Sequence, residues 1–156
     1  MGLIFLIVII IAVTAFVMVG AHTKFKLGGE IKKVSKNKFT HSVIGERDHQ
    51  EPLVEIVGPK LENSVSKVVT ALLIKDFTNT EYTHAVMVLI NDIQVGYLSD
   101  DDALKFLKLL NNKNLSEDEA IEVIALIYGD WGDDNEIGNF KVSLNLPKNI
   151  EDSVIK

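Results

Sequence analysis

The sequence predicts a mainly β fold, a small barrel or sandwich decorated by a helix, with a transmembrane helix ahead of it. Three observations support this: an uncharged apolar stretch at residues 2–21, five or six short β-prone runs separated by turn residues, and one amphipathic run that starts at Ser99. The length of 156 residues suits one domain. The chain contains no cysteine, which excludes disulfides, thiolate zinc sites and a cysteine nucleophile.

The apolar stretch is the strongest single signal. Residues 1–21 carry no charged side chain, and a helix over 2–21 would span roughly 30 Å, the thickness of a bilayer core. A buried helix of a soluble protein is rarely apolar on every side over this length. A cleaved signal peptide is the alternative, because Val19-Gly20-Ala21 resembles a cleavage site, but no basic residue precedes the apolar run. We therefore predict a transmembrane helix over residues 1–21.

Charge is distributed unevenly along the rest of the chain. Residues 22–47 hold seven basic and two acidic side chains, whereas residues 48–156 hold nine basic and twenty acidic ones. Because lysines follow the predicted span and none precede it, the positive-inside rule places the C-terminal part in the cytoplasm, as in a single-pass inner-membrane protein. We expect a basic juxtamembrane tether at 22–50, in which 39–45 is either tether or strand. An acidic β domain should follow at 51–148, and a C-terminal tail at 149–156.

Short runs rich in β-branched residues predict the strands of this domain. The expected strands are Leu53–Val57, Val68–Ile74, His84–Ile90, Ile93–Leu98 and Phe140–Leu146. A short helical turn is expected at Glu62–Ser66 and a polar loop at Phe77–Thr83. Asn91-Asp92 predicts a hairpin turn, because Asn and Asp tolerate positive φ.

One amphipathic helix is predicted after Ser99. Ser99 is a good N-cap, and Asp100, Asp101 and Asp102 follow it at the positive end of the helix dipole, so we interpret them as capping residues rather than as a metal cluster. Asn111-Asn112 ends the helix. Ser116–Glu119 has the pattern of a capping box, and Ile121–Tyr128 beyond it fits either a helix or a strand. A loop is expected at 129–135.

Three motifs occur in a distinctive order. They are Asn79-Thr-Glu-Tyr-Thr-His-Ala-Val86, Gln94-Val-Gly-Tyr-Leu-Ser99 before the helix, and Gly138-Asn-Phe-Lys-Val-Ser-Leu-Asn-Leu146. The set resembles the HIRAN domain in its bacterial standalone versions, over roughly residues 53–147. The resemblance implies a small β-barrel of OB or SH3-like character with one or two helices. It also implies binding of single-stranded DNA at a free 3′ end, as the domain does in helicase-like transcription factors.

The resemblance also implies a set of ligand-binding residues. Carried over position by position, they are Lys60, Asn79, Glu81, Tyr82, Tyr97 and Phe140. The chain departs from the family at several of these places. Leu61, next to Lys60, replaces an aromatic ring, and Glu81 replaces a tyrosine that would stack on a base, while His84 stands where the family has Asn. Each lost stacking platform weakens binding by about 1–3 kcal/mol per base.

Two binding functions follow from these residues. The first is a membrane-anchored module that binds single-stranded DNA ends. The acidic balance of residues 48–156 opposes phosphate binding, which depends on basic side chains. The alternative is therefore a protein-interaction module that has lost DNA binding and takes a basic protein partner.

No catalytic constellation is evident in the sequence. The four histidines lack metal-ligand spacing, and there is no glycine-rich phosphate loop or nucleophile elbow. The acidic residues of the 130–136 segment lack the alternation of an EF-hand, which favours a solvated turn. We therefore predict no enzymatic activity, no metal site and no cofactor, with a hydrolase as the least favoured alternative.

Overall fold

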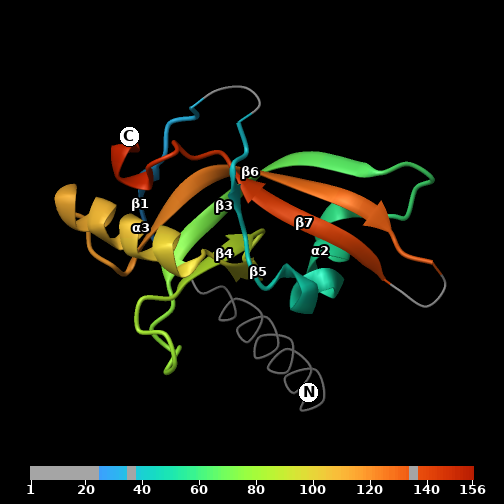
Figure 1. Cartoon of the computed structure of the whole chain (residues 1–156), viewed down its shortest axis with the longest axis horizontal. Helices are drawn as coiled ribbons and strands as arrows, with labels where there is room; N and C mark the ends of the chain where they lie inside the picture. Colours follow the sequence, from blue (N-terminus) through green and yellow to red (C-terminus); the bar gives the residue numbers. More distant parts are fainter. Residues whose placement is uncertain (1–24, 35–37, 134–136) are drawn as a thin grey trace, which may run out of the picture.

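A curled, mostly antiparallel sheet forms the body of the protein. The computed structural model describes residues 25–34, 38–133 and 137–156. Within these ranges the sheet is accompanied by two α-helices, which lie toward opposite ends of it (Figure 1). The mainly β, barrel-like prediction is confirmed at this level. The predicted transmembrane helix lies outside the described residues, and within them no helix has the length and apolar character needed to cross a bilayer.

The elements follow one another along the chain in a simple order. They are β1 (Lys26–Glu30), β2 (His41–Ser42), a 3-10 turn η1 (Glu46–His49), α2 (Gln50–Val57), β3 (Val65–Lys75), β4 (Val86–Ile90), β5 (Ile93–Tyr97), α3 (Asp100–Asn112), β6 (Glu119–Trp131), β7 (Gly138–Leu144) and η2 (Ile150–Asp152). The strands are arranged in the order β2-β7-β6-β3-β4-β5, and β1 joins β6 as a parallel neighbour. The remaining pairs are antiparallel. Three of them join consecutive strands, for which an antiparallel arrangement is expected, whereas β3–β6 and β2–β7 join strands that are distant in the sequence.

The two edges of the sheet are brought together by the residues that follow β2. Val43 N–H donates to Val142 O on β7 at 2.9 Å, so this segment continues the β2–β7 pairing. The next residue pairs with β5 on its other side: Ile44 N–H donates to Tyr97 O at 2.8 Å, and Tyr97 N–H donates to Ile44 O at 2.9 Å. These hydrogen bonds curl the sheet by fastening its first edge to its last.

Gly96 makes this closure possible. Its φ is 151°, and a Cβ built there would collide with the Ile44 carbonyl oxygen and lie 2.6 Å from Val43 Cγ1. Only glycine, which has no Cβ, lets the two backbones approach this closely. The glycine of the Val-Gly-Tyr motif is therefore required by the close packing of the two backbones, whether or not the motif also binds a ligand.

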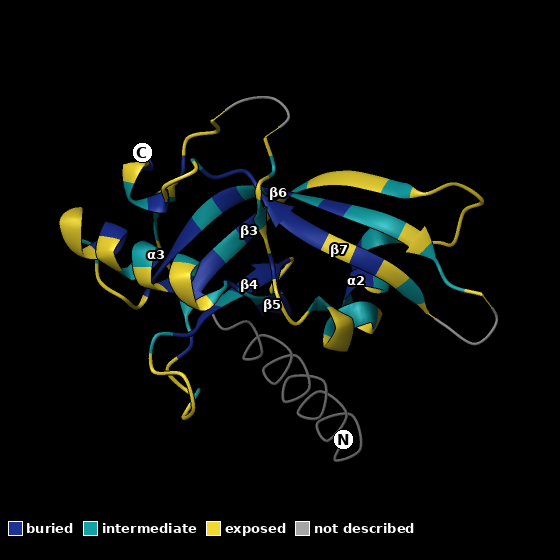
Figure 2. Ribbon diagram, in the orientation of Figure 1, coloured by how far each residue is buried: buried dark blue, intermediate teal, exposed yellow. Residues whose placement is uncertain are grey.

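The main core lies inside the curl. It is built from inward side chains of the strands, such as Leu73 and Ile121, together with Phe106 of α3 and Leu53 of α2, all fully buried. Figure 2 shows buried residues along the middle of the sheet and a largely exposed loop between β3 and β4. The two helices cover the inner face, because each presents an apolar stripe toward the strands.

Helix α3 and the β4–β5 hairpin confirm their predictions. Ser99 Oγ accepts a hydrogen bond from Asp102 N at 3.3 Å, as an N-cap does. Asn91 and Asp92 adopt φ of 52° and 62°, the conformation that a two-residue hairpin turn of this type requires. Local chemistry decides both features, and neither depends on distant residues.

Residues Leu53–Val57 form the end of helix α2, and the prediction of a strand there is wrong. Leu53 and Ile56, three residues apart, are the buried side chains, which is a helical spacing. Pro52 lies in the first helical turn, where no N–H is needed from it. Gly58, at φ 98°, ends the helix and donates its N–H to Val54 O at 2.9 Å. A segment of five residues is too short for its apolar pattern to distinguish a strand from a helix. The helix forms because it buries Leu53 and Ile56 in the core.

Two other segments also differ from the predicted secondary structure or resolve an ambiguity in it. The turn predicted at Glu62–Ser66 differs, because β3 already begins at Val65. The ambiguous run Ile121–Tyr128 is a strand, part of the long β6 that pairs with β3 along most of its length. Glu119 accepts the N–H of Ser116 at 2.9 Å, which is half of a capping box, but the chain then enters a strand. The expected 129–135 loop begins later, since β6 continues to Trp131.

The basic segment is not a tether over its described residues. Residues Lys26–Glu30 form β1, and Ile31 and Val43 are buried in the core. The expected C-terminal tail also joins the sheet, because Lys156 N–H donates to Glu30 O at 3.0 Å and Ile155 pairs with Ile31. These segments have few apolar residues, so periodicity could not reveal strands that are held mainly by main-chain hydrogen bonds.

Replacing Gly96 should test the closure. We expect Gly96→Ala to destabilise the fold by at least about 3 kcal/mol, because the new methyl group must displace the Ile44 backbone. Gly45→Ala is the control, since Gly45 has a φ of 77° but open space around its Cβ position, so only about 1 kcal/mol of backbone strain is expected. Urea unfolding followed by the fluorescence of the single tryptophan, Trp131, measures both. Equal losses for the two variants would contradict this account of the closure.

Candidate functional site

A pocket of about 330 Å³ opens where the β3–β4 loop, β5 and the start of α3 meet. Its lining residues come from four segments of the chain: Ile44, Asn79, Tyr82, Ala85, Tyr97, Leu98, Ser99 and Asp100. Three of the six sequence-predicted residues, Asn79, Tyr82 and Tyr97, therefore meet at one place. We call this the Tyr97 pocket.

The loop that carries Asn79 and Tyr82 is ordered by its own side chains. Asn79 Oδ1 accepts hydrogen bonds from Glu81 N at 3.1 Å and from Tyr82 N at 2.9 Å. This is the Asx-turn geometry for which Asn is favoured in loops. Asn79 thus fixes the direction of the loop and leaves the Tyr82 ring at the pocket rim, where it is 49% exposed.

Asp76, at the start of the loop, holds Tyr97 in place by a hydrogen bond. The Tyr97 hydroxyl donates to Asp76 Oδ2 at 3.0 Å, while Asp76 Oδ1 accepts from Thr78 N at 3.0 Å and from Thr78 Oγ1 at 2.6 Å. Burial alone would raise the pKa of Asp76, but these hydrogen bonds outweigh it and keep the pKa of the carboxyl below its usual range. Asp76 is therefore an ionised anchor that joins the loop to β5.

Negative charge dominates the mouth of the Tyr97 pocket. Asp100 is the one charged residue among those that line it, and its side chain is 71% exposed. His84 Nε2 lies 3.7 Å from Asp100 Oδ1. Asp101 and Asp102 follow in the same helical turn. These carboxylates lie at the positive end of the α3 dipole and offset it, although Asp101 also pairs with Lys105 and Asp102 with His41. The residues that line the pocket include no Lys or Arg that could bind a phosphate.

The other three predicted residues lie elsewhere. Lys60 Nζ donates to Gly132 O at 2.8 Å near the end of β6, and Glu81 is exposed on the loop without lining the pocket. The Phe140 ring is fully buried and packs edge to face against Trp131, with 5.0 Å between ring centroids. Phe140 is thus a core residue, and its ring is not presented to solvent.

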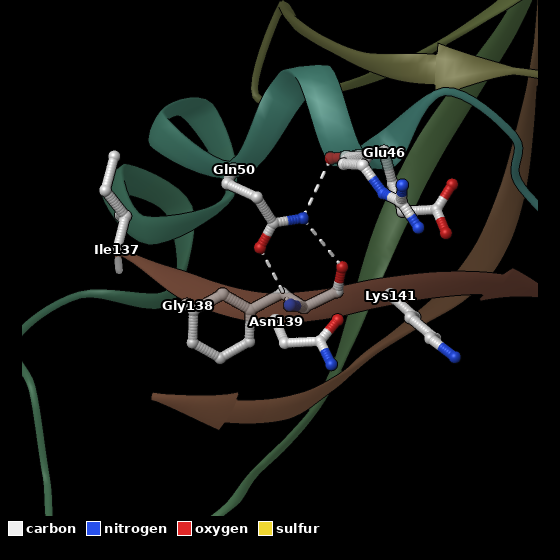
Figure 3. Close-up of a pocket in the computed structure, with 8 residues that line it drawn as sticks. Glu46, Gln50, Ile137, Gly138, Asn139 and Lys141 are labelled. Atoms are coloured by element: carbon white, nitrogen blue, oxygen red, sulfur yellow. Dashed lines mark hydrogen bonds between the residues drawn. The ribbon is translucent and has the colours of Figure 1, made fainter. Parts of the chain in front are cut away.

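A larger cavity of about 590 Å³ lies beside the start of β7, between η1 and Gly138 (Figure 3). The Gln50 carboxamide reaches across it to the β7 backbone. Gln50 Nε2 donates to Phe140 O at 2.9 Å, and Phe140 N–H donates to Gln50 Oε1 at 2.8 Å. The polar atoms at the centre of this cavity are therefore used to hold the strand.

A third hollow of about 390 Å³ lies on the other side of Tyr97. It is lined by Phe25, which directly precedes β1, by Met87 of β4 and by Phe77 of the loop, and also by Lys75 and Asp118. Lys75 pairs with Glu117, and its Nζ lies 5.2 Å from the centroid of the Phe77 ring. Tyr97 thus separates two concave surfaces of different character.

Sequence reasoning missed Asp76, Ile44 and the pocket role of Asp100. Asp100 could be recognised only as a helix-capping residue, since its place in the same pocket as Tyr82 depends on the fold. Ile44 lies in a segment that had no clear assignment. Asp76 did carry a local signal, because Asp followed by Phe-Thr-Asn is typical of a loop held by side-chain hydrogen bonds.

Within the described ranges, no group of three or more His, Asp or Glu side chains gathers closely enough to hold a metal ion.

Comparisons with known proteins found no match: no family model, no curated protein and no solved structure matches the chain.

Asp76 should make stability depend on pH. Its pKa is lower in the folded state, so its contribution is present above the usual carboxyl pKa of 3.8 and is lost as pH falls through the folded value. We expect Asp76→Asn to lower the unfolding free energy by about 1–3 kcal/mol at pH 7. The difference from the natural chain should shrink in urea unfolding at increasingly acidic pH. A difference that is constant down to acid pH would contradict this role.

Proposed function

We propose that the chain is a non-enzymatic, HIRAN-like binding module with an OB or SH3-like barrel, and that its Tyr97 pocket binds a basic segment of a partner protein. The observation that carries this proposal is the composition of the pocket. Two tyrosine rings and apolar side chains surround a hollow whose one charged lining residue is Asp100. Aromatic faces and a carboxylate together favour the ammonium or guanidinium group of Lys or Arg.

The charge of the whole domain supports the same partner. Residues 48–156 carry twenty acidic and nine basic side chains. This excess of negative charge raises the rate of encounter with a basic partner and lowers the rate of encounter with nucleic acid. Lys60, the basic residue that the HIRAN resemblance assigns to the ligand, is engaged with Gly132 instead of lining the pocket. Phe140 is buried and offers no stacking surface.

Binding of single-stranded DNA ends is the second candidate, and one observation favours it. Three residues assigned from the resemblance line one pocket: Asn79 and Tyr82 come from the β3–β4 loop, and Tyr97 comes from β5. Tyr82 and Tyr97 could stack on bases, each contributing about 1–3 kcal/mol. This candidate needs its phosphates neutralised by basic side chains from outside the pocket.

The proposed module is held at the cytoplasmic face of an inner membrane. The support is the uncharged segment 2–21 and the lysines that follow it. A single span would concentrate the binding site at the membrane surface and restrict it to partners that come there.

Reversing the charge of Asp100 separates the two candidates. We expect Asp100→Lys to weaken binding of a fluorescein-labelled Lys/Arg-rich peptide about tenfold, equivalent to about 1.4 kcal/mol, because attraction becomes repulsion. The same change should strengthen binding of a short single-stranded oligonucleotide with a free 3′-hydroxyl if DNA is the ligand. Fluorescence anisotropy at low salt measures both.

Asp101→Lys is the matched control. It makes the same charge change in the same helical turn but at a residue that does not line the pocket. A basic peptide that loses affinity equally in both variants responds to overall charge alone, which would contradict the assignment of the pocket. Saturable DNA binding by the natural chain, with a preference for a free 3′ end, would establish the second candidate in place of the first.

A further inference from the structure

The sheet is apolar on both faces where β1, β3, β4 and β6 lie together. Successive side chains of a strand point to opposite faces. On β3, Leu73 points into the main core while Leu72 and Ile74 point to the other face, and on β4 Val88 and Met87 divide in the same way. An antiparallel sheet with one solvated face carries polar residues on that face. Here the second face is apolar as well, so it requires a cover.

We define the outer apolar face by the residues that share this second side or border it. They are Phe25, Leu27, Leu72, Ile74, Phe77 and Met87. Phe25 packs over the small cluster around Ile74, but Leu72 and Met87 are only partly buried. Leu27 remains 54% exposed and Phe77 63% exposed. The part of the chain that the structure describes therefore covers this face incompletely.

The position of Phe25 indicates what lies over the face. Phe25 is the first described residue, and three residues separate it from the uncharged segment that ends at Ala21. The four Cα–Cα steps from Ala21 to Phe25 reach about 14 Å at most. If the segment spans a membrane, as proposed above, the lipid headgroups lie within that distance of Phe25 and of the face around it.

The two lysines that border the face are already paired with carboxylates. Lys26 Nζ lies 2.6 Å from Glu119 Oε1, and Lys75 pairs with Glu117. Asp118 adds a carboxylate to the adjoining hollow, and Glu122 of β6 lies opposite Leu72 in the sheet. Since the two neighbouring lysines are occupied, the face does not attract anionic lipids. Contact with a bilayer would come from burial of apolar and aromatic side chains, with the lysines at the level of the headgroups.

We propose that the outer apolar face rests on the lipid surface, with the Phe77 ring inserted among the headgroups. This inference rests on the proposed membrane anchoring. It also gives the Tyr97 pocket a location, because Tyr97 borders both that pocket and the hollow lined by Phe25 and Phe77. A partner would then reach the pocket along the membrane plane.

The absence of cysteine from the chain permits a direct test. Phe77→Cys and Leu61→Cys each create a single labelling site, and Leu61 is the matched control because it is 69% exposed on a loop outside this face. The full chain is labelled with an environment-sensitive fluorophore and reconstituted into phosphatidylcholine vesicles that contain spin-labelled lipid. We expect quenching at position 77 to exceed that at position 61 several-fold.

Equal quenching at the two positions would overturn the inference. So would a label at position 77 that is shielded from water but unquenched by the lipid, since protein would then cover the face. Leu27→Cys, on β1, gives a second position with the same expectation if Phe77→Cys fails to fold, which Trp131 fluorescence reveals. Alkaline carbonate extraction of the same vesicles separates the two proposals. A chain that stays in the membrane without quenching disproves only the docking, and a chain that is released disproves the anchoring and the docking with it.

Discussion

The hydrogen bonds between Ile44 and Tyr97 are the constraint on which the rest of the structure depends. They fasten one edge of the sheet to the other and so curl it around its core. They also place Tyr97 where its ring can line a pocket and its hydroxyl can reach Asp76. The missing side chain of Gly96 is the condition for this contact, because the two backbones meet at that point.

From this closure the site follows in short steps. Asp76 binds the Tyr97 hydroxyl and the Thr78 backbone, so the loop after β3 starts in a defined direction. Asn79 then turns the loop toward the pocket. Helix α3 begins shortly after β5, which brings Asp100 into the same pocket. The pocket is thus a product of one strand pairing and two loop residues, and its negative charge comes from the residues that start a helix.

The sequence predicted those parts whose cause is local. Ser99 begins a helix through its own hydroxyl, and Asn91-Asp92 turns the chain through its own φ preference. The sequence-based prediction failed where contacts with distant residues determine the secondary structure. Leu53–Val57 fits a strand by itself and becomes a helix because Leu53 and Ile56 find a core to enter. Lys26–Glu30 is polar and glycine-containing, and its strand exists only because β6 offers it a partner. Of the candidate site, Asn79, Tyr82 and Tyr97 were named from a family resemblance, but only the fold shows that they line one pocket. The burial of Phe140 depends on packing against Trp131, which the sequence did not reveal.

The Gln50 carboxamide has a consequence beyond the cavity that it crosses. Strand β2 pairs only with the last residues of β7, so the beginning of β7 is an edge strand with main-chain groups turned outward. Gln50 imitates a neighbouring strand there, since its amide satisfies both the N–H and the C=O of Phe140. Because the N–H and C=O of Phe140 are already used, a strand from another chain cannot pair with the sheet at this residue, and this opposes extension of the sheet along the edge.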